Sequence, residues 1–164
     1  MSGIEVNSEP LSGGSPAADT AGNAFLAGLT EGPGSHEAAE KMRDAGHTLK
    51  TLAQNGSFAV NEAGFNAYMK ACNFFLDGYK TMIHDLTLLT EFAEMGSSPY
   101  ATLVAGFNVE VAAGGGEAML PNLVLMRDAV ETARDALAIA RKNYRETDHA
   151  HKKSFDQLNK KINN

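Results

Sequence analysis

The sequence predicts an all-α fold, in which two long helices form an antiparallel hairpin and two shorter helices cover it, much as in a four-helix bundle. Two observations lead to this expectation. Apolar residues recur every three or four positions over four segments, and no segment has the pattern of a strand. The chain has 164 residues, of which 43% are hydrophobic, so it is long and apolar enough for one domain with a buried core.

The first part of the chain, residues 1–33, is expected to be a flexible tail, within which Asn23-Ala24-Phe25-Leu26-Ala27 could make a short helical contact. It holds three of the five prolines and is rich in Gly, Ser and Ala. Such a segment buries too little apolar surface to offset the entropy lost on ordering. We therefore expect the helical domain to span 34–160, with a frayed end over 161–164. Its first short helix should cover 35–55, with Ser35 as its N-cap.

The first long helix is predicted over 61–95, because Asn61 can cap it and Gly96 and Pro99 end it. Its apolar stripe persists for more than four heptads. The members of this stripe that we assign to a packing or partner face are Phe65, Tyr68, Phe75, Tyr79, Met82, Leu86 and Leu89. The stripe is wider than one neighbouring helix covers, so either the short helices or a second chain should cover the remainder.

The second short helix is predicted over 99–113, and the three glycines that follow it break the chain. The second long helix should then cover 121–160, since Pro121 suits a first-turn position. Its apolar seam completes the predicted packing face with Leu123, Met126, Val130 and Leu137. We expect this seam to pack along the stripe of the first long helix.

Composition and charge argue against several classes of function. The chain has no Trp, one Cys and a net charge of −6, so a stacking surface for nucleic acid and a disulfide framework are both disfavoured. No apolar run approaches the ~20 residues that span a bilayer. The basic C-terminal helix offers contact with an anionic membrane as an alternative to its ordinary role as a solvated helix end.

The residues with chemical potential do not assemble into a predicted active site or metal site. Asp148 and His151 share a helical face, but two ligands do not make a metal site. Cys72 lies in the middle of the apolar stripe, which indicates a small core residue with an inert thiol. We therefore expect no catalytic residue, no metal and no cofactor, and the chain is predicted not to be an enzyme.

Tyr144 and Asp148 form the pair that we regard as the candidate site. On a helix they lie one turn apart on the same face and present a phenol together with a carboxylate. A docking protein could read the pair with an apolar slot and a cation. The simpler interpretation is that Tyr144 ends the apolar seam and Asp148 makes an ordinary ion pair with Lys152.

The pair lies in the run Ala140-Arg141-Lys142-Asn143-Tyr144-Arg145-Glu146-Thr147-Asp148, after a helical hairpin. This arrangement resembles the helical-hairpin proteins of actinobacterial (ESX-type) type VII secretion, the WXG-like and secretion-associated families. The resemblance covers roughly residues 57–160. The chain departs from the family pattern because it has no Trp, and so no Trp-x-Gly turn, and because residues 99–113 are an added segment.

The resemblance implies a function for the pair and a set of partners. Tyr144 and Asp148 would form an export signal that the membrane ATPase of the secretion machinery recognises. The protein would pair with itself or with a similar helical protein. It would be secreted without a cleavable signal peptide, or be cytoplasmic before export. A different expectation is a cytoplasmic helical adaptor or chaperone that holds a partner's helix.

Overall fold

A computed structural model describes residues 15–91 and 94–162 of the chain. These residues form helices α1 (Pro16–Glu31), α2 (His36–Gln54), α3 (Glu62–Thr90), α4 (Pro99–Ala113) and α5 (Met119–Ile162). The described residues contain no strand, which confirms the predicted all-α class.

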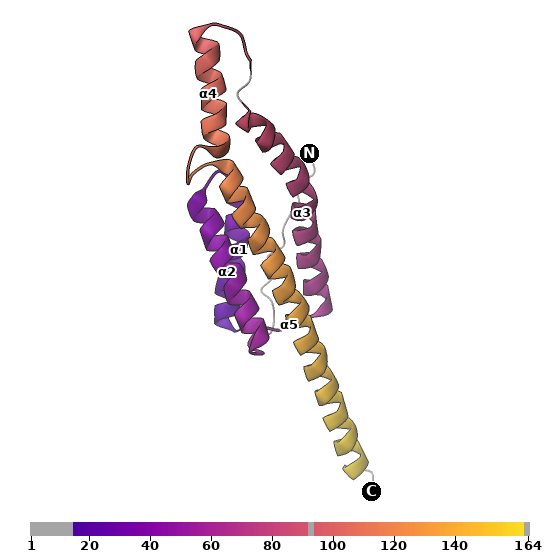
Figure 1. The fold of residues 1–164 in the computed structure, drawn as a ribbon. Coiled ribbons are helices and arrows are strands. Elements are labelled where there is room, and N and C mark those ends of the chain that lie inside the picture. Colours follow the sequence, from indigo (N-terminus) through magenta and orange to yellow (C-terminus); the bar gives the residue numbers. More distant parts are fainter. Residues whose placement is uncertain (1–14, 92–93, 163–164) are drawn as a thin grey trace.

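Helix α5 is the axis of the molecule, with α2 along one side of it and α3 along the other (Figure 1). Helix α2 runs parallel to α5, since His36 pairs with Asn122 near the start of both helices and Lys50 pairs with Asp135 further along. Helix α3 runs antiparallel, since its first residue, Glu62, pairs with Arg141. The predicted hairpin of α3 and α5 is therefore present.

The main partner of α5 is α2, however, and not α3 as expected. Helix α2 buries seven residues, whereas α3 buries only Cys72 and Leu86. The reason is close approach: a Cβ built on Gly46 of α2 would stand only 3.0 Å from the carbonyl oxygen of Ala129. Helix α3 brings large aromatic side chains to α5 instead, which keep the two backbones further apart.

The expected flexible tail is corrected over its second half, because residues 16–31 form α1. Pro16 occupies the first turn and Gly32, with φ of 73°, follows the last residue. Helix α1 packs on α2 and buries Ala18, Ala21, Phe25 and Gly28. Its small residues contribute little to a hydrophobicity pattern, but they let the two helices approach closely. Residues 1–14 lie outside the described part of the chain.

The helix ends agree with the predicted caps in most places. The side chains of Ser35 and Asn61 accept hydrogen bonds from the N–H groups of Ala38 and Gly64, as N-caps do. Helix α3 ends at Thr90, five residues before the predicted end, and α5 continues through the predicted frayed positions 161 and 162.

Helix α5 is longer than the bundle around it. Every described residue from Tyr144 onward is exposed, and this part of α5 leaves the other helices behind (Figure 1). At ~1.5 Å per residue, residues 144–162 extend for about 28 Å. We call this segment the C-terminal extension.

Candidate protein-recognition site

The candidate site lies where α5 leaves the bundle, just past two anchoring residues, Arg141 and Asn143, which we call the collar. The amide of Asn143 donates to the carbonyl oxygens of Ala53 at 2.7 Å and Phe58 at 3.4 Å. These two acceptors lie at the end of α2 and in the connection to α3. Asn143 therefore ties α5 to the chain reversal between these helices.

Arg141 ties the start of α3 to the same level of α5. Its guanidinium lies 3.0 Å from a carboxylate oxygen of Glu62 and 4.4 Å from the centroid of the Phe65 ring. The Arg141 side chain is only 18% exposed, so its apolar stem is packed while the charge is paired. The collar holds three segments together at the point where the bundle ends.

Arginines continue along the face of α5 that meets α3. Arg127 lies over the ring of Tyr79, 5.7 Å from its centroid. Between these two levels, Arg134 has a buried Nε without a hydrogen-bond partner among the described residues. Burial raises the pKa of the nearby Cys72 thiol to about 11, and the charge of Arg134 opposes this rise. The contact between α3 and α5 is thus built from aromatic rings and arginines, and it is less apolar than predicted.

Tyr144 and Asp148 follow the collar directly. Tyr144 is 43% exposed, and the Asp148 carboxylate, 49% exposed, lies 3.2 Å from the ammonium of Lys152. The structure thus contains both the exposed pair and the ion pair of the simpler interpretation. An exposed ion pair of this kind contributes about 1 kcal/mol or less, so a partner can displace Lys152 at small cost.

The structure divides the predicted packing face into three groups. The residues on α5 and one residue on α3 are buried, namely Leu123, Met126, Val130, Leu137 and Leu86. The half-buried residues all lie on α3, and they are Phe65, Tyr68, Phe75, Tyr79 and Met82. Leu89 is exposed at 40%. Phe65, Tyr68 and Phe75 pack against the core with one side. The described helices therefore cover the α3 stripe only in part.

The second short helix, α4, is predicted to cover the hairpin, but its apolar side is exposed. Tyr100, Leu103, Phe107 and Val111 share one face of α4 and are 76%, 68%, 64% and 36% exposed. Helix α4 is apolar on nearly all sides, with Glu110 as its only charged residue. When a helix has no polar face, the spacing of its apolar residues does not show which side is buried. The side of α4 that packs on the bundle could therefore not be predicted.

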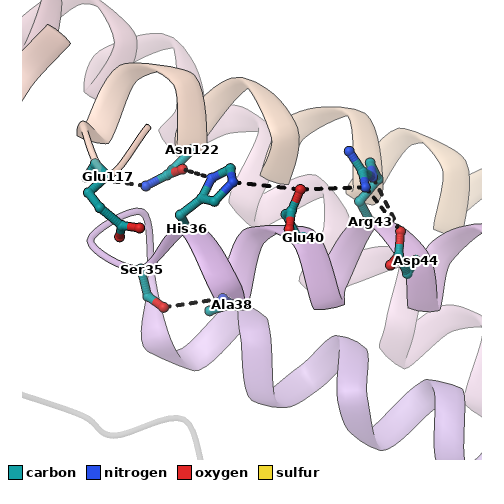
Figure 2. Close-up of polar contacts among 8 residues, drawn as sticks. All are labelled: Ser35, His36, Ala38, Glu40, Arg43, Asp44, Glu117 and Asn122. Atoms are coloured by element: carbon teal, nitrogen blue, oxygen red, sulfur yellow. Dashed lines mark hydrogen bonds and ion pairs between the residues drawn. The ribbon is translucent and has the colours of Figure 1, made fainter. Parts of the chain in front are cut away.

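A second group of polar residues joins the helices at the opposite end of the bundle (Figure 2). Asn122 is fully buried, and its amide donates to the carbonyl oxygens of Pro33 at 3.2 Å and Glu117 at 3.4 Å. Its side-chain oxygen lies 2.8 Å from Nδ1 of His36, whose other ring nitrogen is 3.6 Å from Glu40. These contacts join the turn before α2 to the turn before α5, which is a structural role.

The described residues contain no group of three or more His, Cys, Asp or Glu side chains placed to hold a metal ion. None of the described helices is both long and apolar enough to cross a lipid bilayer. No protein-family model, curated protein or solved structure matches this chain.

Proposed function

We propose that this chain is a non-enzymatic helical protein that is exported by, or assists, a type VII secretion system, and that it pairs with itself or a similar helical protein. Tyr144 and Asp148 are the export signal, and the membrane ATPase of the secretion machinery is the partner that binds them. In this proposal the protein is cytoplasmic before export and is found outside the cell afterwards.

The observation that carries the proposal is the position of Tyr144 and Asp148 just beyond the collar. The two side chains lie one turn apart, and every described residue of α5 from Tyr144 onward is exposed. This end of α5 extends beyond the other described helices (Figure 1). A partner can therefore reach both groups at once. A phenol beside a carboxylate provides an apolar contact and a charge-assisted hydrogen bond, which together give more specificity than either group alone.

The proposal is tested by following the protein in a host that carries a type VII system. The Tyr144→Ala and Asp148→Ala variants are compared with the parent chain by the amounts in the culture medium and in the cells. We expect each variant to accumulate in the cells and to fall at least tenfold in the medium. The parent chain must in turn depend on the secretion ATPase for its appearance outside.

Glu146→Ala is the matched control for the Asp148 variant. Glu146 also makes an exposed ion pair four residues away on the same helix, with Lys142 at 3.8 Å. It lies off the face that Tyr144 and Asp148 share. Export of Glu146→Ala should equal that of the parent chain. Unchanged export of the Tyr144 and Asp148 variants, or a parent chain that never leaves the cell, would contradict the proposal.

The exposed face of α4 favours a second candidate, a cytoplasmic adaptor or chaperone that holds a partner's helix. Exposed apolar patches of this kind often mark interaction sites. An adaptor of this type would stay in the cell, and its complex with the partner would survive the Asp148→Ala change. The export experiment therefore separates the two candidates.

A further inference from the structure

Each end of the molecule carries an exposed apolar face. The charged residues near the two faces have opposite signs. The first end, which we call the tip, consists of α4 and the end of α3. Its apolar residues are the four on the exposed face of α4 together with Leu88, which is 54% exposed. Contiguous exposed apolar faces often mark interaction sites.

Among Lys, Arg, Asp and Glu, the part of the sequence that forms the tip contains acidic residues alone. The sequence has no Lys or Arg between Lys80 and Arg127, and this interval holds five acidic residues. They are Asp85, Glu91, Glu94, Glu110 and Glu117. An apolar face inside such a field favours a partner that is apolar on one side and basic on the other.

The C-terminal extension has this character. Phe155, Leu158 and Ile162 recur at helical spacing on one face and are 68%, 55% and 77% exposed. Four lysines flank them, and Asp156 is the only acidic residue from position 152 to the end of α5. The lysines are Lys152, Lys153, Lys160 and Lys161. This half of the C-terminal extension is a basic amphipathic helix with no partner in the bundle.

We propose that the C-terminal extension of one copy of this chain packs against the tip of a second copy. The apolar face of the extension, from Phe155 to Ile162, spans seven helical steps, about 11 Å, and so fits within the eleven steps, about 17 Å, from Tyr100 to Val111 on the tip. The extension cannot reach the tip of its own chain, since the two lie at opposite ends of the long molecule (Figure 1). The contact is therefore made between chains.

Such a contact is heterologous, because each copy uses one surface on one partner and a different surface on the next. The contact between extension and tip describes how the chain pairs with itself, which is one part of the proposed function. The inference rests on the proposed function through this part alone. The test below measures association in solution, so it can fail while the export signal of Tyr144 and Asp148 stands.

The experiment uses two variants of the full chain, each with one of the two surfaces disrupted. The tip variant is Leu103→Lys with Phe107→Lys, and the extension variant is Phe155→Ser with Leu158→Ser. All four side chains are more than half exposed, so both variants should keep the helical content and the urea midpoint of the parent. Sedimentation velocity at low ionic strength gives the masses of each variant alone and of the equimolar mixture.

We expect the parent to grow in mass with concentration and each variant alone to sediment as one chain, with association weakened at least tenfold. The mixture should form a complex of two chains and no more, since only one intact tip can meet one intact extension. Added salt should weaken this complex. Phe74→Lys is the matched control, because Phe74 is 72% exposed on α3 outside both surfaces, and it should associate like the parent.

Several results would overturn the proposal. One is a parent that remains a single chain at all concentrations, and another is a mixture that forms no complex. Association of either variant by itself would indicate contacts between two tips or between two extensions. Co-sedimentation of the parent, but not of the extension variant, with phosphatidylglycerol vesicles, while no self-association occurs, would assign the extension to an anionic membrane instead.

Discussion

The guanidinium of Arg141 lies 4.4 Å above the ring of Phe65, and this contact sets the register between α3 and α5. The same relation recurs fourteen residues away on both helices, where Arg127 lies over Tyr79. Two contacts at equal spacing on antiparallel helices determine a single alignment. That alignment places the start of α3 beside the collar, beyond which every described residue of α5 from Tyr144 onward is exposed.

Replacement of Arg141 by Ala should lower the free energy of unfolding by about 1–2 kcal/mol. The change removes a cation–π contact worth ~0.5–2 kcal/mol and an ion pair to the exposed Glu62 worth ~1 kcal/mol or less. Arg145→Ala, on the exposed side of the collar, should change stability by less than about 0.5 kcal/mol. Urea unfolding followed by circular dichroism measures both, and equal effects of the two substitutions would contradict the role given to Arg141.

Two glycines of α1 should respond to Ala in opposite directions. At Gly28 a Cβ would stand 2.8 Å from the carbonyl oxygen of Ala38 and 2.9 Å from Cβ of Met42, whereas at Gly22 nothing lies within 4 Å. Gly22→Ala should stabilise by about 1 kcal/mol through helix propensity. Gly28→Ala gains the same amount but forces α1 away from α2, which costs about 1–3 kcal/mol. We expect a net loss of about 1 kcal/mol.

Thermal and urea unfolding of these two variants measure how closely α1 is packed. A stabilised Gly28→Ala chain would mean that α1 is held loosely and that residues 16–31 behave as the flexible tail predicted from composition.

Asn122→Ala should lower the free energy of unfolding by about 2–3 kcal/mol. Its fully buried side chain bonds to His36 and to two backbone carbonyls. A buried polar group left unsatisfied costs ~1–3 kcal/mol, and the part-exposed His36 can bond to water instead, so the total stays near the upper end of this range. Asn66→Ala, on the exposed side of α3, is the control and should lie within about 0.5 kcal/mol of the parent. If both variants unfolded at the same urea concentration, Asn122 would not join the two turns.

The Cys72 thiol should make stability fall at alkaline pH. Burial raises its pKa in the folded chain from 9.0 to about 11, so the unfolded chain loses the proton first. The stabilising contribution is complete below pH 9 and is lost as the pH rises toward 11. Between pH 8 and 10.5 the parent should lose about 2 kcal/mol more than a Cys72→Ala variant does.

The comparison with Cys72→Ala cancels the other groups that titrate in this range. Tyr68 is one of them, since burial, and to a smaller extent the charge of Asp19, raise its pKa. Urea unfolding of both chains across this pH range gives the difference. Parallel pH profiles would show that the thiol is solvated in the folded protein.

Helix positions could be predicted from the sequence because the signals that start and stop a helix are local. Ser35 and Asn61 cap their helices through their own side chains, and the limits of α4 at Pro99 and Ala113 agree with the prediction. The full length of α1 was not predicted, because Ala and Gly contribute weakly to a hydrophobic pattern. The same small residues pack well, since Gly28 allows the backbone of α2 to approach closely.

The candidate pair itself was readable in the sequence, since Tyr144 and Asp148 are spaced by one helical turn. Their exposure was not, because it depends on where the neighbouring helices end. Asn143 reaches back to Ala53 and Phe58, and nothing in the local sequence shows that α2 stops at this level of α5.

The sequence by itself thus determined the all-helical class, most helix limits and the presence of an apolar seam on α5. The tertiary structure alone decided that α2 covers this seam, that α3 lies against arginines, and that the other described helices leave α4 and the C-terminal extension exposed. The physical reason is that periodicity shows which side of a helix is apolar, whereas the choice of neighbour depends on how closely two backbones can approach. Gly46 beside Ala129 permits the closer approach, and the aromatic residues of α3 do not.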